Sequence, residues 1–325
     1  MLMKVHTLDI DSSERDTNVY THANNYVVTL REPIYNVTQL KLISARIPTP
    51  QLLICDTNKV LSVNGTDVVL EANNFTSGVT LASELQRQLF YVTGPPTPTP
   101  INQVEFDQYR NTLTFSNTGS ESEFTFEFFD GTNGYLNGDA VLTTPHQTFG
   151  FTSNNQSSSN YTLTSGVLNL QGPNSLVLRL TTGSDEFTKT VYSRTPFYTG
   201  HILLNGSDFI NYSHADDPLT HEFYKGSQKY IKDIHVEFFY MSHGRLIPYD
   251  FRNQDHVLKF EISCSTDKLE GLPKVPLEVV EKKLPPPISI PEVIVDTYKW
   301  KIGVIILLCI LLLYIMRRRS PIPSE

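Results

Sequence analysis

The chain has 325 residues and a formal net charge of -8, and 18% of its residues are charged. The acidic balance argues against general nucleic-acid binding, because proteins that bind nucleic acids neutralise phosphates with lysine and arginine. Aromatic residues make up 11%, and Asn, Ser and Thr are abundant, a mixture typical of short strands joined by polar turns. This length leaves room for one large β domain or two smaller ones.

The cysteines and the N-terminal residues bear on the cellular compartment. Cys55, Cys264 and Cys309 lack the spacing of a metal site or a disulfide framework. The first residues contain no apolar run long enough for a signal peptide. We therefore expect membrane insertion through a late, C-terminal segment, with the rest of the chain in a reducing cytosol. Asn-X-Ser/Thr sequences, which matter only if the chain faces a lumen, begin at Asn36, Asn64, Asn74, Asn155, Asn160, Asn205 and Asn211.

The N-terminal region alternates apolar and polar residues, as strands with one buried face do. Residues 1–9 are predicted to form a short edge strand. Residues 26–30 and 37–47 are predicted to form two further strands, with Pro33 ending the first of them. The polar residues 12–16 connect the edge strand to the next one.

A hairpin and a helix follow. Asn64 and Gly65 lie between two β-branched runs, which is the strongest short hairpin signal in the chain. Leucines recur at helical spacing over residues 80–91, so an amphipathic helix is expected there, with Thr80 as its cap. We expect this helix to cover an open end or face of a β-sandwich.

Residues up to 266 form what we call the head. The remainder of the head is predicted to be strands and polar loops. A low-complexity stretch that ends at residue 160 indicates a boundary between two parts of the head. These parts are an N-terminal β-sandwich region at 1–160 and a C-terminal β region at 161–266. Residues 211–218 are predicted to be a polar loop. The predicted strands lie within 104–115 on both sides of a turn, and at 124–128, 161–163, 167–170, 176–180, 190–192, 201–204, 231–241 and 256–262.

The C-terminal part indicates a stalk and a membrane anchor. Residues 267–297 mix proline with Lys, Glu and Val, as in a semi-rigid spacer that could extend on the order of 90 Å. Residues 302–316 carry no charge and span about 22 Å as a helix, less than the roughly 30 Å of a bilayer core. Aromatic and basic flanks complete a transmembrane segment over 298–319, which is followed by a tail, 320–325.

The alternative for this segment is a buried helix of a soluble core, which is disfavoured because no partner helices are evident and three arginines follow. Side chains expected to contact lipid are Trp300, Ile302, Ile305, Leu308, Leu311 and Tyr314. Side chains expected to reach headgroups are Lys299, Lys301, Arg317, Arg318 and Arg319. The three arginines are also the one basic run that could contact nucleic acid.

Motifs of catalysis are missing from the sequence, which has no GxGxxG, GxxxxGK[ST], HExxH or GxSxG. One loop could bind a metal, although a solvated loop is the preferred interpretation; its residues are His214, Asp216, Asp217 and His221. A looser group between His243 and His256 is interpreted as turn residues. We predict no catalytic residue, no metal and no cofactor, and a protein that is not an enzyme.

Two stretches far apart in the chain carry a family resemblance. The first comprises Ser12-Ser13-Glu14-Arg15-Asp16, Tyr20, YVVTL at 26–30, IYNV at 34–37 and the strand ending at Ile47-Pro48. The second comprises VEFFY at 236–240, Gly244, PYDF at 248–251 and DHVL at 255–258. Together they resemble the minor capsid proteins of nucleocytoplasmic large DNA viruses, of the algal-virus and giant-virus type. The resemblance spans roughly residues 10–262 and is anchored at its two ends.

The resemblance implies a jelly-roll-like antiparallel β-sandwich head, with one or two sandwiches, located in the virion between the capsid shell and an internal membrane. The implied partners are the lipid bilayer, the major capsid protein, other minor capsid proteins and further copies of the chain. Arg15 and Asp16 either are solvated or dock a neighbouring strand or chain. The candidate capsid-contact residues are Arg15, Asp16, Tyr249, Asp250, Phe251, Asp255 and His256.

We therefore predict a mostly β, single-pass membrane protein with a short helix in its head, a Pro-rich stalk and a C-terminal transmembrane helix. Its predicted function is structural: it tethers a capsid shell to the internal membrane. The alternative is a membrane-anchored surface adhesin or receptor-binding spike with glycosylated asparagines. A third hypothesis is a membrane-bound hydrolase that uses the 214–221 loop.

Overall fold

The computed structural model describes residues 3–91, 101–119, 122–182, 185–186, 199–222, 229–266 and 296–318. The chain forms two units, a head at 1–267 and a C-terminal unit at 268–325. The head consists mostly of antiparallel strands with one α-helix, and the described part of the C-terminal unit is the helix α2 (Asp296–Arg318). These findings confirm the mostly β head, its short helix and the long apolar C-terminal helix. The predicted stalk lies almost entirely outside the described residues.

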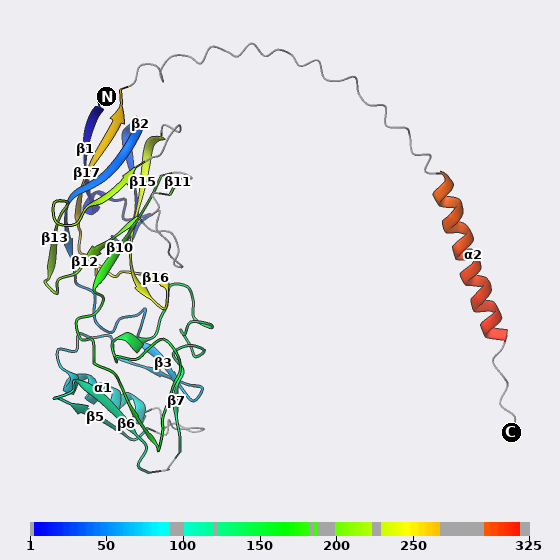
Figure 1. Cartoon of the computed structure of the whole chain (residues 1–325), viewed down its shortest axis with the longest axis horizontal. Coiled ribbons are helices and arrows are strands. Elements are labelled where there is room, and N and C mark those ends of the chain that lie inside the picture. The colour runs from blue at the N-terminus through cyan, green and yellow to red at the C-terminus, as the bar shows by residue number, and fades with distance from the viewer. Residues whose placement is uncertain are drawn as a thin grey trace. The chain divides into compact units, whose positions relative to one another are not determined.

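The larger sheet of the head has ten strands and follows the path β1-β17-β2-β15-β10-β11, with four short strands attached beside it. Figure 1 shows it at one end of the head. Its strands are β1 (Met3–Asp11), β2 (Asn25–Pro48), β10 (Ser175–Thr182), β11 (Asp185–Glu186), β12 (Gly200–Leu203), β13 (Phe209–Ser213), β14 (Leu219–Glu222), β15 (Lys229–Ser242), β16 (Arg245–Pro248) and β17 (Val257–Ser265).

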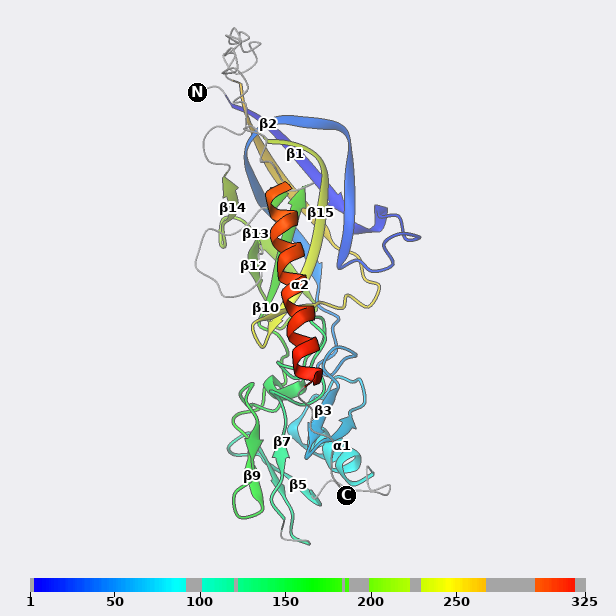
Figure 2. The same cartoon turned by 90° about the vertical axis from the view of Figure 1, so that its right-hand side faces the viewer.

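The strand β2 makes this sheet curl, because its two parts pair with different neighbours. Its first part pairs with β15, whereas its later part pairs with β17 on one side and with β13 and β14 on the other. Figure 2 shows β2 as the long, bent blue ribbon. The ladder with β15 slips between Ile231 and Asp233, opposite the segment that contains Pro33. Pro33 therefore does not end a strand as predicted, since its missing N–H falls where the ladder is interrupted.

Alternating residues of these strands build the first hydrophobic core. Tyr26, Leu42, Phe238 and Phe260 are among its fully buried members. Burying a side chain of this size contributes about 1.5–3 kcal/mol. The cluster joins residues 10–47 to residues 176–264, so the beginning and the end of the head share one core.

The intervening part of the chain forms a second region, which lies at the other end of the head in Figure 1. It contains one sheet with the order β4-β3-β7-β8, another with the order β5-β6-β9, and the helix α1 (Gly78–Tyr91). Its core is rich in phenylalanine and lies within residues 53–168. The strands are β3 (Val60–Val63), β4 (Thr66–Val69), β5 (Gln103–Asp107), β6 (Thr112–Ser116), β7 (Thr125–Phe126), β8 (Gln156–Ser157) and β9 (Thr162–Thr164). The boundary proposed at residue 160 stays a prediction.

The hairpin and the helix of this region confirm two predictions and correct one. β3 and β4 form the expected hairpin around Asn64-Gly65. In α1 the leucines at helical spacing are fully buried. The helix begins at Gly78, and the Ser77 hydroxyl, rather than Thr80, accepts the N-terminal bond, from the Thr80 N–H at 3.2 Å. Ser77 precedes the first helical residue, which is where a capping oxygen reaches the free N–H groups.

One strand prediction and one loop prediction differ from the structure, and one predicted strand is not described. Residues 167–170 do not form a strand. The predicted loop 211–218 is instead the end of β13 followed by a short turn, because Ile210 and Tyr212 alternate inward despite their polar neighbours. The strand predicted at 190–192 lies outside the described residues.

Candidate functional site

The two stretches that carry the family resemblance meet at the start of β17. Asp255 Oδ1 accepts a hydrogen bond from Ser12 Oγ at 2.9 Å and forms an ion pair with Arg15 Nη1 at 2.5 Å. Arg15 also donates to the carbonyls of Ser12, at 2.7 Å, and Tyr20, at 3.2 Å. The backbone of Ser12 donates to the His256 carbonyl, while His256 N–H donates to Ser12 Oγ. The loop after β1 is thus tied to a segment more than 200 residues away.

The ring of His256 continues this cluster into the core. It is 1% exposed and packs against Phe238 and Phe251, with ring centroids 4.7 and 5.0 Å away. Its Nε2 lies 2.8 Å from the Tyr26 hydroxyl, and no described residue bonds to its Nδ1. Burial lowers the pKa of His256 to about 3, so the ring is neutral at physiological pH.

The structure separates the candidate capsid-contact residues into two groups. The side chains mainly enclosed in the head are Arg15, Tyr249, Phe251 and His256. Asp16 and Asp250 are exposed and accept backbone hydrogen bonds from nearby turns, and the Asp255 side chain is 40% exposed. Arg15 binds Asp255 in the segment that leads into β17, so its side chain docks another part of the same chain. Contact of these residues with other capsid proteins stays a prediction.

A second cluster fixes the turn between β15 and β16 to the second region. The His243 ring lies 4.0 Å from the His146 ring, measured between centroids. Thr144 Oγ1 lies 3.0 Å from His146 Nδ1 and 3.2 Å from His243 Nε2. Burial lowers the pKa of His146 to about 4. Burial, together with the nearby His146 ring and Arg245, lowers the pKa of His243 to about 3. We conclude that both rings are neutral in the folded head at physiological pH.

Hydroxyl pairs and a guanidinium complete the junction. Ser242 Oγ lies 2.6 Å from Thr143 Oγ1, and the Tyr240 hydroxyl lies 2.9 Å from Thr57 Oγ1. Arg245 donates to backbone carbonyls of the second region. The sequence predicted the turn but not this pairing, because residues 99 to 183 positions apart meet here. His243 and His256, which were grouped as turn residues, belong to different clusters.

The loop considered as a metal site has no metal-binding geometry. Among the residues that the structure describes, no group of three or more His, Cys, Asp or Glu side chains could hold a metal ion. His214 Nδ1 lies 3.1 Å from the Leu42 carbonyl instead. The described cysteines Cys55, Cys264 and Cys309 are free.

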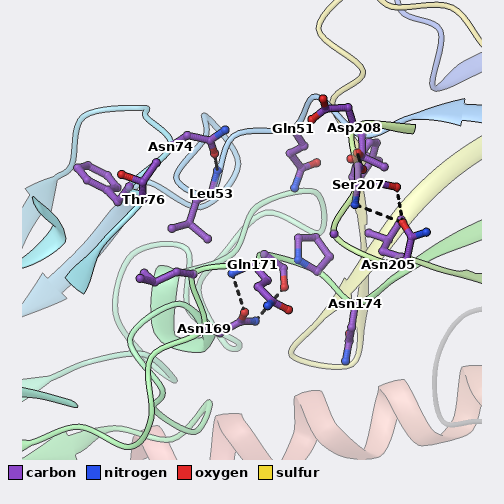
Figure 3. Close-up of a pocket in the computed structure, with 18 residues that line it drawn as sticks. Gln51, Leu53, Asn74, Thr76, Asn169, Gln171, Asn174, Asn205, Ser207 and Asp208 are labelled. Atoms are coloured by element: carbon purple, nitrogen blue, oxygen red, sulfur yellow. Dashed lines mark hydrogen bonds between the residues drawn. The ribbon is translucent and has the colours of Figure 1, made fainter. Parts of the chain in front are cut away.

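An open groove of about 700 Å³ lies between the two regions of the head (Figure 3). Its sides come from the segment after β2, the segment before α1, the segment before β10 and the loop before β13, and Tyr249 contributes from just after β16. Amide and hydroxyl side chains such as Gln51, Asn174 and Ser207 line it, and Asp208 is its charged residue. None of the described residues that line the groove is lysine or arginine, so it suits a neutral hydrogen-bonding group better than an anion. No local sequence motif could reveal it, because five separate segments contribute.

The C-terminal unit presents a different kind of surface. Residues Tyr298–Arg318 of α2 are long and apolar enough to cross a membrane, by length and composition. None of this span is buried in the protein, so all the predicted lipid-facing side chains are exposed. Lys299 and Lys301 lie at its beginning and Arg317 and Arg318 at its end, whereas Arg319 lies outside the described residues.

Comparisons with known proteins match one family over part of the chain and solved structures at low sequence identity. Residues 4–77 match a family of unknown function, DUF5901. No curated protein matches the chain. The mavirus penton protein is similar in structure, with 8% identity and a TM-score of 0.35, covering 81% of this chain and 99% of that one. A structure of the Sputnik virophage has 10% identity and a TM-score of 0.35, covering 81% and 98%. The function proposed below therefore rests on the residues of this chain.

Proposed function

We propose that this protein is a non-enzymatic structural component of a virus particle, anchored in an internal membrane by α2. The observation that carries the proposal is the helix itself. Its apolar side chains are exposed along the described helix, and a helix of this composition is stable when lipid surrounds it. Basic residues near both ends would extend toward the headgroups.

The capsid role is supported by the sequence resemblance to minor capsid proteins. Its two anchoring stretches lie at opposite ends of the head sequence and are joined through Arg15 and Asp255. This ion pair offers a structural explanation for the occurrence of both stretches in the resemblance, since both are needed to close the same sheet. The finer proposal is a jelly-roll-like minor capsid protein between the shell and the membrane.

The proposed mechanism is mechanical and has three parts. The helix supplies the anchor, residues 267–297 set the spacing, and the head contacts the shell. Asp16 and Asp250 are exposed and could bind basic groups of neighbouring capsid proteins, whereas the enclosed residues hold their loops in place. Arg317, Arg318 and Arg319 would contact anionic headgroups or the genome.

Deleting residues 300–319 tests the anchor. The full chain should float with liposomes after extraction in high salt, and the deletion variant should remain in the soluble fraction. A variant lacking only 320–325 is the control and should still float. If the variant without the helix floats equally well after the salt extraction, the anchor proposal is wrong.

The surface-spike alternative retains one supporting observation, since several of the Asn-X-Ser/Thr asparagines are exposed, among them Asn74 and Asn205. Protease treatment of intact particles distinguishes the two locations. A head beneath the shell should be protected until detergent opens the particle, with no mass shift after glycosidase treatment. Cleavage without detergent together with a glycosidase shift would favour the spike.

A further inference from the structure

The strand β1 ends the larger sheet with a long, regular edge. It pairs with β17 over all nine residues of Met3–Asp11, and its register has no shift. At the other end of the path, β11 has two residues, and the four strands beside the path have four or five. No described strand pairs with the outer side of β1. This confirms the predicted edge strand, which has the expected length of nine residues but begins at Met3 and ends at Asp11.

The backbone groups of β1 point alternately toward β17 and outward. Ser12 follows β1 directly, and continuing the ladder by one residue places it opposite His256. The Ser12 N–H donates to the His256 carbonyl at 3.0 Å, so Ser12 is a bonded position of the ladder. Because bonded residues alternate in an antiparallel pair, even-numbered residues of β1 bond to β17. The N–H and C=O groups of Met3, Val5, Thr7 and Asp9 therefore point away from the sheet.

The side chains beside this edge are incompletely covered. Met3 and Val5 are 52% and 54% exposed on the outer face. Leu8 packs against the first core but is only partly buried. A strand added at the edge would cover these apolar groups as well as satisfy the backbone.

Natural sheets usually protect such an edge with proline, a bulge or a very short strand. β1 has none of these, since its residues are MKVHTLDID and its ladder is continuous. Its charges lie near the ends, with Lys4 at the beginning and Asp9 and Asp11 at the end. The middle of the strand is therefore open to pairing.

We propose that β1 pairs antiparallel with β1 of a second copy of this chain, forming a symmetric dimer through a continuous sheet. Outward donors and acceptors of one antiparallel edge match those of its own copy, and a two-fold axis normal to the sheet keeps both cores on the same side. Antiparallel pairing also brings the lysine end of one strand to the acidic end of the other, whereas parallel pairing would align like charges.

The register that pairs the whole strand places Thr7 on the two-fold axis. Val5 then lies opposite Asp9, and Met3 opposite Asp11. Lys4 lies opposite Ile10, between the two aspartates of the other copy along the strand. The interface is narrow, so the dimer should be weak in solution and strengthened where copies share one membrane.

Replacing Thr7 tests the backbone contact. Thr7→Pro removes an N–H that points outward and leaves the ladder with β17 unchanged. In detergent-solubilised full chain, analytical ultracentrifugation should show a dimer whose dissociation constant rises at least tenfold in Thr7→Pro. Thr7→Val keeps the N–H and should dimerise like the original chain. Equal association of all three, or a monomer at every concentration, would overturn the proposal.

Disulfide formation tests the register separately, in a Cys309→Ser background. Two Thr7→Cys residues on the axis would have Cα atoms about 5.5 Å apart, within disulfide range. Two Val5→Cys residues would be about 13 Å apart along the strand and should not crosslink. Oxidation should therefore give a covalent dimer for Thr7→Cys alone. Crosslinking of both variants, or of neither, contradicts the assigned pairing even if Thr7→Pro misfolds.

Discussion

Arg15 and Asp255 lie 240 residues apart in sequence and form a 2.5 Å ion pair in which the arginine side chain is only 7% exposed. The guanidinium also bonds to two backbone carbonyls, so its position is determined from three directions. An arginine enclosed in this way depends on its carboxylate partner, because an unpaired buried charge is strongly unfavourable.

Asp255→Ala should therefore destabilise the head by about 1–3 kcal/mol, less than for a fully buried pair because water reaches the carboxylate. Urea unfolding measures the change in free energy. Glu14→Ala, at an exposed position in the same loop, is the control and should change stability by no more than about 0.5 kcal/mol. Equal effects of the two substitutions would show that the ion pair does not hold the loop.

The buried histidines predict that the head loses stability in acid. Burial lowers the pKa of His256 and His243 to about 3 and that of His146 to about 4, from 6.5. Below pH 6.5 the unfolded chain takes up protons that the folded head accepts only near pH 4 at His146 and near pH 3 at His243 and His256. The unfolding free energy should thus fall steadily between pH 6.5 and 3, by several kcal/mol in total.

His146→Phe should reduce this dependence, since it removes one of the titrating rings from the junction. The measurement is the difference in unfolding free energy between pH 7 and pH 5. His22→Phe, at an exposed position, is the matched control and should retain the full difference. An unchanged difference in His146→Phe would mean that this ring does not contribute to acid sensitivity.

Two glycines with the same backbone conformation differ in their surroundings. Gly65 and Gly150 both have φ of +75°, but a Cβ at Gly150 would lie 2.3 Å from the Val167 carbonyl oxygen, whereas the space at Gly65 is open. Gly65→Ala should cost about 1 kcal/mol through backbone strain. Gly150→Ala should cost at least about 2 kcal/mol more, because a backbone atom has to move. Melting temperatures of the two variants test the difference, and similar values would contradict it.

A charge in the middle of α2 should weaken membrane insertion. Leu308 lies near the centre of the span Tyr298–Arg318, where arginine costs about 3 kcal/mol. Leu308→Arg should reduce the fraction of protein that resists alkaline extraction. Met316→Arg, close to the end of the span, should have a smaller effect because its side chain can reach the interface. Equal losses would suggest that α2 does not span the bilayer.

Periodicity alone revealed a large part of the fold. Alternating residues predicted the edge strand and the long strands 37–47 and 231–241, and leucine spacing predicted α1. The failures arose where tertiary contacts outweigh local preference. Pro33 lies within β2 because the ladder slips beside it, and β13 alternates inward although it follows a loop of polar residues.

The candidate residues were predictable as a group but their roles were not. Arg15, Asp255 and His256 were singled out as surface contacts, yet the structure encloses two of them, since an ion pair between distant segments has no local pattern. The pairing of His146 with His243 and the polar groove likewise depend on segments that meet only after folding.

The pairing of β2 with both β15 and β17 has a consequence for synthesis. The first fifty residues cannot complete their sheet until the ribosome has made residues up to 265, whereas the second region has all its core residues by about residue 170. The α1 region should therefore fold first during translation, and β1 and β2 should wait, with slow closure as in other folds dominated by long-range contacts.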